Sequence, residues 1–212
     1  AAAGAVLLAA VLAFSVLVGP ARAVSYGAEE LAFVRLINQY RASLGVTPLL
    51  VSDLVTDAAE KHSLDMAKYG LNPANPHDSW YSDFFPYGVD PGQRMTRCGY
   101  NSASGWGEII AAGPSLATTV FALGKASPNH NPRMIDPNYR VMGVAREYEP
   151  DSEYQYYWTV DFGVFVDSTA RRLDDTPPSS TTTTSAPLPT TSTTTSTTTT
   201  ESPTTTSTTT TT

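Results

Sequence analysis

Cysteine is almost absent from this sequence: the 212 residues include one, Cys98. A single cysteine excludes an internal disulfide framework. Cys98 lies in "RMTRCGY", where it is either a reactive thiol or a small buried apolar residue. We expect the second, because a free cysteine usually packs as a small hydrophobe.

Basic residues are also scarce, with 13 Lys and Arg against 20 Asp and Glu and a net charge of −7. Surfaces that bind nucleic acid or anionic lipid carry basic patches. We therefore expect no nucleic-acid partner and no polybasic attachment to a membrane. The sequence has no phosphate-binding glycine loop, CxxC pair or HExxH motif, so the chemistry associated with those motifs is not indicated.

The two ends of the chain differ in composition from the part between them. Residues 1–23 form an apolar run that ends in an A-x-A site, which predicts a signal peptide cleaved before Val24. A retained membrane anchor is the alternative, since about 18 apolar residues can span a bilayer. Residues 174–212 are rich in Thr, Ser and Pro and predict a disordered stalk or linker. Residues 24–173 remain as one folded domain.

Helical spacing of apolar residues and capping signals locate the helices of this domain. The expected helices and one proline-rich loop follow in chain order: helices 27–44, 53–69, 90–99 and 114–127, and a loop at 131–139. In the second helix His62 shares a face with apolar residues spaced by four, so we expect it to be packed or half-exposed rather than a ligand.

Strand signals are concentrated in the second half of the domain. The alternating runs 140–148 and 154–166 flank the turn-like "EPDSE", which predicts an antiparallel hairpin. Residues 107–112, "GEIIAA", predict a further short buried strand. A hairpin that is covered by helices gives the α+β class.

A long segment, residues 71–92, is rich in Asn, Pro, Asp and Gly and predicts a loop. It carries Trp80, Tyr81 and Phe84, and long loops inside compact domains are often functional. We expect these three aromatic side chains to contact a ligand. Plain packing of the loop over the sheet is the alternative.

Three residues form the candidate site. Glu108 lies in "GWGEIIAAG", an otherwise small or apolar run, where a buried carboxylate needs a partner. His77 and His130 lie in polar, proline-containing segments. Two imidazoles and one carboxylate are a common zinc ligand set, and the same groups can act in general acid–base catalysis. The spacing of the three residues matches no local metal motif.

The order of several motifs resembles a known family. "FVRLINQYRASLGVTPLL", the segment at His77, "RMTRCGY", "GWGEIIAAG", "SPNHNPRMIDPNYRVMGVA" and "YYWTVDFG" are together similar to the CAP superfamily, also called the SCP domain, in its compact bacterial form. The superfamily includes cysteine-rich secretory proteins, antigen 5 and pathogenesis-related class 1 proteins. The resemblance implies an α-β-α sandwich with a central antiparallel sheet and an open cleft.

The resemblance also implies a role for the three residues. His77, Glu108 and His130 match three of four cleft residues that bind a divalent metal such as zinc in family members. The fourth, a glutamate, corresponds to Ser127, and Ile109 replaces an asparagine. The tetrad is therefore incomplete.

The function implied is that of a secreted, extracellular binding protein. A surface protein that is displayed outside the cell by its Ser/Thr-rich stalk is a second interpretation. A lipid, sterol, peptide or glycan is the expected ligand, and we expect a monomer. The alternative is a metal-dependent hydrolase or protease that uses His77, Glu108 and His130.

Overall fold

The computed structural model describes residues 24–173, so the predicted signal peptide 1–23 and stalk 174–212 lie outside the described residues. The elements within this range follow in chain order: α1 (Ala28–Ser43), β1 (Leu50–Val51), α2 (Asp53–Tyr69), α3 (Pro91–Arg97), a 3-10 turn η1 (Ser102–Ser104), β2 (Trp106–Ala112), α4 (Ala117–Ala126), α5 (His130–Ile135), β3 (Val141–Tyr148) and β4 (Tyr156–Gly163).

The strands form one sheet in the order β1-β3-β4-β2. The predicted hairpin is confirmed as β3 and β4, which pair antiparallel along their whole length, and β2 pairs antiparallel with the other side of β4. The two-residue β1 adds a parallel pair next to β3, which the sequence did not indicate. Strand β2 therefore lies at one edge of the sheet.

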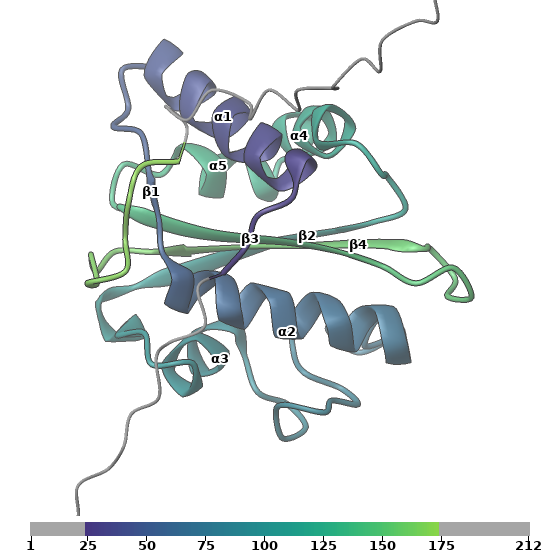
Figure 1. Cartoon of the computed structure of the whole chain (residues 1–212). Helices are drawn as coiled ribbons and strands as arrows, with labels where there is room; N and C mark the ends of the chain where they lie inside the picture. The colour runs from purple at the N-terminus through teal and green to yellow at the C-terminus, as the bar shows by residue number, and fades with distance from the viewer. Residues whose placement is uncertain (1–23, 174–212) are drawn as a thin grey trace, which may run out of the picture. The chain divides into compact units, whose positions relative to one another are not determined.

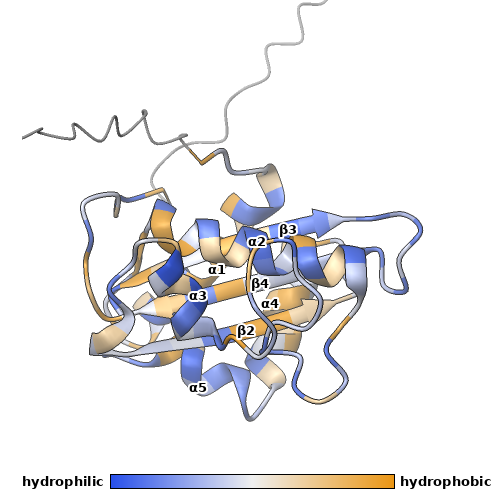
Figure 2. Ribbon diagram, turned by 90° about the horizontal axis from the view of Figure 1, so that it is seen from below, coloured by the Kyte–Doolittle hydropathy of each residue, from blue (hydrophilic) through white to orange (hydrophobic). Residues whose placement is uncertain are grey.

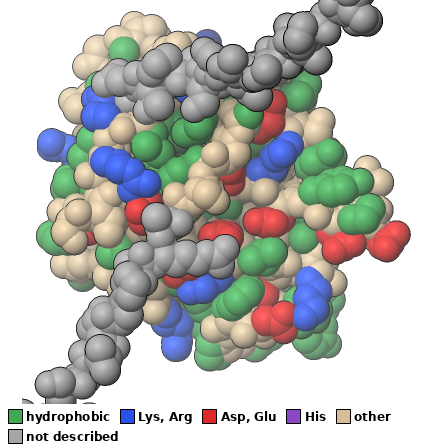
Figure 3. Space-filling view, viewed as in Figure 1, with side chains coloured by type: hydrophobic (Ala, Val, Ile, Leu, Met, Phe, Trp, Pro, Cys, Tyr) green, Lys and Arg blue, Asp and Glu red, His purple; other side chains and the backbone are tan. Residues whose placement is uncertain are grey.

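Helices cover both faces of this sheet. Helices α1, α4 and α5 lie on one face, and α2 and α3 lie on the other (Figure 1). This arrangement confirms the α+β class and the α-β-α sandwich. Hydrophobic residues lie along the strands and on parts of the larger helices, while α3 and α5 are largely hydrophilic (Figure 2). On the face seen in Figure 3, acidic and basic side chains are interspersed among hydrophobic ones.

The predicted helices at 27–44, 53–69 and 90–99 are confirmed, and their ends follow ordinary capping chemistry. The Ser52 hydroxyl accepts a hydrogen bond from the Val55 N–H at the start of α2, and Gly70 ends the helix at a φ of 83°. Asp90 caps α3 in the same way, and Pro91 occupies its first turn. The helix expected at 114–127 begins later, at Ala117.

The loop predicted at 131–139 is wrong in its first half, because α5 runs from His130 to Ile135. Pro132 is the third residue of this helix, where a backbone N–H has no intrahelical partner and proline is tolerated. The Ser127 hydroxyl accepts hydrogen bonds from the backbone N–H groups of Asn129 (3.3 Å) and His130 (3.2 Å), which stabilises the start of α5.

The main core lies between the sheet and the α1/α4/α5 layer. Trp158 of β4 is fully buried there, and its ring centroid lies 5.7 Å from that of Phe33 in α1. On the opposite face α2 packs very closely on β3: a Cβ atom on Gly143 would lie 2.3 Å from the backbone N of Thr56. Within residues 24–173, no helix is long and apolar enough to cross a membrane.

Candidate functional site

Glu108 lies in the middle of β2, on the sheet face that α2 covers. Its side chain is buried, and in the sheet register it lies opposite Asp161 of β4, which in turn pairs with Gly143 of β3. Successive residues of a strand point to opposite faces, so the neighbouring Ile109 faces the α1/α4 layer instead. The strand thus presents one carboxylate to the α2 side and apolar side chains to the other.

Two side chains contact the Glu108 carboxylate. The His77 ring nitrogen Nδ1 lies 2.8 Å from one carboxylate oxygen, and the Arg94 guanidinium donates to the other. Arg94 is itself fully buried, and it also donates to the backbone carbonyls of His77 (2.6 Å) and Val89 (3.2 Å). Arg94 therefore joins α3, the long loop and β2 through one side chain.

These contacts decide the charge of Glu108. Burial by itself raises the pKa of its carboxyl group, but Arg94, His62 and the hydrogen bond from His77 together outweigh burial and lower that pKa to about 2. Glu108 is therefore ionised, and its charge is balanced by Arg94.

Asp161 has the opposite protonation state. Burial and then the charge of Glu108 raise the pKa of the Asp161 carboxyl group well above its usual range. Two neighbouring buried carboxyl groups do not both ionise, so one keeps its proton. Neither oxygen of Asp161 has a hydrogen-bond partner within the described residues, which agrees with a neutral carboxyl group.

His62 completes the buried cluster. It is only 3 % exposed, and its Nε2 atom lies 3.2 Å from the backbone carbonyl of Pro76 in the long loop. Burial, followed by the charge of Arg94, lowers the pKa of His62 to about 4, so the ring is neutral at pH 7. The expectation that His62 is a packed residue is thus confirmed.

Sequence reasoning missed that His62, Arg94 and Asp161 meet at Glu108. The signal for Arg94 was its place in "RMTRCGY", and the signal for Asp161 was the polar position in "YYWTVDFG". Neither signal says which side chain on another element it would meet.

His130 occupies a different place. It begins α5, and within residues 24–173 its ring makes no hydrogen bond to His77 or Glu108. Burial and then the charges of His77 and Arg133 lower its pKa, so His130 is neutral at pH 7 and lies within electrostatic range of His77. Its ring lines a groove between β2 and α4.

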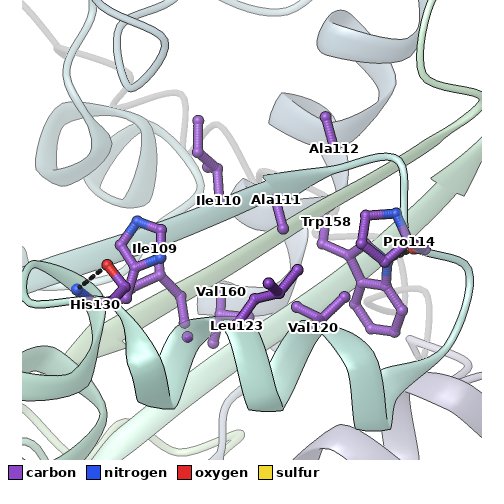
Figure 4. Close-up of a pocket in the computed structure, with 12 residues that line it drawn as sticks. Ile109, Ile110, Ala111, Ala112, Pro114, Val120, Leu123, His130, Trp158 and Val160 are labelled. Carbon is purple, nitrogen blue, oxygen red and sulfur yellow. Dashed lines mark hydrogen bonds between the residues drawn. The ribbon is translucent and has the colours of Figure 1, made fainter.

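This groove, the β2–α4 groove, has a volume of about 310 Å³. Its lining is mostly apolar and comprises Ile109, Ile110, Ala111, Ala112, Pro114, Val120, Leu123, Gly124, Ser127, His130, Trp158 and Val160. His130 lies at one end, and Pro114 with Trp158 lies at the other (Figure 4). Leu123 is 55 % exposed, so the groove is open to solvent along α4.

The aromatic residues of the long loop lie elsewhere, beside α2. The tilted rings of Trp80 and Tyr81 contact each other with 4.7 Å between their centroids, and the Tyr81 ring lies 6.1 Å from that of Tyr69 in α2. Phe84 lines a second cavity with Leu64 of α2, whereas Trp80 and Tyr81 line neither this cavity nor the β2–α4 groove. The structure does not bring the three aromatic residues and His130 into one cleft.

The donor set around Glu108 does not fit a divalent ion. Both carboxylate oxygens already have partners, and the buried guanidinium of Arg94 supplies the positive charge that a metal would supply. Within residues 24–173, no group of three or more His, Cys, Asp and Glu side chains has a metal-binding arrangement. We therefore derive no chemistry through a metal at this site.

Cys98 is half-buried at the end of α3 and packs beside Val55, Met95 and Tyr100. Burial, with the nearby Asp57 carboxylate adding to it, raises the pKa of its thiol to about 12. The thiol therefore stays protonated, which agrees with the expectation of a small apolar residue.

Comparisons with known proteins agree with this fold. The chain resembles an outer surface protein of Borrelia burgdorferi, with 20% identity, a TM-score of 0.52, and coverage of 62% of this chain and 89% of the other. It also resembles an extracellular protein containing an SCP domain from Bacillus anthracis, with 21% identity, a TM-score of 0.52, and coverage of 64% and 40%. No curated protein sequence matches.

The sequence profile described as "CAP: Cysteine-rich secretory protein family" matches residues 34–162, from α1 to β4. The match contains His77, Arg94, Glu108, His130 and Asp161, although the chain has a single cysteine. The chain belongs to the cysteine-rich secretory protein (CAP) family.

Proposed function

We propose that this protein is an extracellular binding module that holds an apolar ligand in the β2–α4 groove. The groove itself carries the proposal: it is concave, largely apolar and open along α4, and its volume lies near the lower end of the range for ligand pockets, about 300–1,000 Å³. Neutral His130 at one end supplies a polar group that can orient the ligand. The predicted signal peptide, and the surface and extracellular proteins that share the fold, support the location.

The buried cluster has a positioning role in this proposal. Arg94, Glu108 and His77 tie α3, the long loop and β2 together, and β2 forms one wall of the groove. We do not propose a hydrolase, because Glu108 is only 2 % exposed and its oxygens are occupied. A general base has to reach the proton that it takes.

Ligand titrations with palmitate, cholesterol sulfate and a short apolar peptide test the proposal, with the fluorescence of Trp158 as the readout. Trp80 and Trp106 do not line the groove, so both are replaced by Phe in the reporter protein. At least one probe should change the emission of Trp158.

A pair of variants on α4 shows whether a bound probe occupies the groove. Leu123→Asp places a charge in it and should weaken binding about tenfold or more. Ala122→Asp adds the same charge on the exposed side of α4 and should leave binding unchanged. No binding of any probe, or equal loss in both variants, would refute the proposal.

A further inference from the structure

The outer edge of β2 is open next to the groove. Gly113 N–H donates to the Tyr156 carbonyl of β4 (2.9 Å), and Val164 N–H donates to the Gly105 carbonyl (3.3 Å). Backbone groups alternate in direction along an antiparallel strand. The N–H and C=O groups of Ile110 and Ala112 therefore point away from β4, and no hydrogen bond to them is found within the described residues.

The opposite edge of the sheet, at β1 and β3, is protected. β1 pairs with the start of β3, and further along the Glu30 carboxylate accepts the Arg146 backbone N–H at 3.0 Å. The next residue, Glu147, places a further carboxyl group at the same edge. Charges and covering elements are the usual means of preventing strand addition.

β2 has none of these protections beside the groove. Its last four residues, 109–112, are Ile, Ile, Ala and Ala, without a charge, a proline or a bulge, and they keep continuous register with β4. The segment is half-buried after Ile109, so solvent reaches the edge. An open, apolar and regular edge is a template for another strand.

Resting on the proposed function, we propose that the ligand of the β2–α4 groove is an extended peptide segment that pairs with β2 at Ile110 and Ala112. Its alternate side chains lie over the groove, against Val120 and Leu123 of α4. Backbone pairing supplies affinity and the groove selects apolar side chains, as in other cases of strand addition. A lipid can fill the groove, but it has no row of donors and acceptors to match the edge.

Peptide N-methylation tests the pairing. The probe is an acetylated, amidated eight-residue peptide that alternates valine and threonine. Since N–H groups of a strand point alternately to its two edges, methylation of one alternate set should abolish binding and methylation of the other set should not. Equal binding of the two methylated peptides would overturn the inference.

Two variants at Ala112 test the same contact from the side of the protein. Ala112→Pro removes an N–H that β4 does not use, which an edge strand tolerates, and should weaken peptide binding about tenfold. Ala112→Val keeps the N–H and should bind normally. Circular dichroism of both variants shows whether the fold is kept. Amide exchange adds a measurement on the unaltered protein: saturating peptide should protect Ile110 and Ala112, and unchanged exchange would contradict the pairing.

The remaining outcomes separate the two proposals. If palmitate or cholesterol sulfate binds in the groove but the peptide does not, the peptide inference fails and the binding-module proposal stands. If no probe binds, both fail. If sedimentation velocity shows a dimer that Ala112→Pro dissociates, the edge pairs with a second copy and the peptide inference is overturned.

Discussion

Removal of the Arg94 guanidinium should destabilise the fold more than any ordinary surface change. In Arg94→Met the Glu108 carboxylate stays buried without its main counter-charge, and breaking a buried ion pair in this way costs about 3–5 kcal/mol. The carbonyls of His77 and Val89 also lose a donor. Because native domains have about 5–15 kcal/mol of stability in total, the loss is a large fraction.

The pH dependence of this loss follows from the pKa of Glu108. In the native protein that pKa is lowered to about 2. The pair therefore contributes its full stability at pH values above about 4.3, the ordinary pKa of a glutamate, and this stability is lost as the pH falls toward 2. Without Arg94, burial raises the pKa, and stability is lost as the pH rises instead. The difference between native protein and variant should therefore be larger at pH 7 than at pH 4, and it should become small only as the pH approaches 2.

Urea unfolding at both pH values measures this difference, and two further variants make the result specific. Adding Glu108→Gln to Arg94→Met should restore much of the lost stability, because the charge is removed with its partner. Arg41→Met is the matched control: Arg41 is also buried, but it donates to backbone carbonyl oxygens, including those of Thr47 and Met134. Its cost should be insensitive to pH and to Glu108→Gln. A cost for Arg94→Met below about 1 kcal/mol, or no rescue by Glu108→Gln, would refute the reasoning.

Other positions give independent predictions. Asp161 is neutral in the folded protein and ionised when unfolded above about pH 4, so its burial costs stability as the pH rises. In thermal melts, Asp161→Asn should be more stable than the native protein at pH 8 but not at pH 3.5. An equal gain in stability at both pH values would contradict this. Gly143→Ala should cost about 1–3 kcal/mol or more in urea unfolding because its Cβ meets the α2 backbone, whereas Gly124→Ala meets only the flexible Met134 side chain and should cost far less. The Cys98 thiol should react with iodoacetamide at pH 8 about a hundredfold more slowly than free cysteine, and a comparable rate would exclude its high pKa.

Periodicity and capping predicted most elements because these signals are local. Ser52 and Gly70 bracket α2, and the alternation on either side of "EPDSE" gave the β3–β4 hairpin. Local signals failed where the deciding contact is distant or the element is short. Helix α5 depends on the Ser127 hydroxyl despite Pro132, and β1 has only two residues, too few to show a period.

The candidate site could be predicted only in part, because its contacts join residues that lie far apart in the sequence. The contact of His77 with Glu108 followed from the resemblance to the CAP family, not from spacing along the chain. The partnership of Glu108 with Arg94 and Asp161 depends on the packing of α3 and on the register of β2 against β4, which no local pattern encodes. The zinc site that the resemblance implied does not agree with a carboxylate held by a buried arginine.

A measurement of where the ligand binds tests the central claim most directly. An NMR titration of the protein with the valine–threonine peptide and with palmitate should shift the backbone amides of β2 and α4, with the largest changes between Ile110 and Leu123. The amides of Trp80, Tyr81 and Phe84 beside α2 should stay unchanged. Shifts confined to the aromatic loop, or no shifts with either probe, would contradict the account.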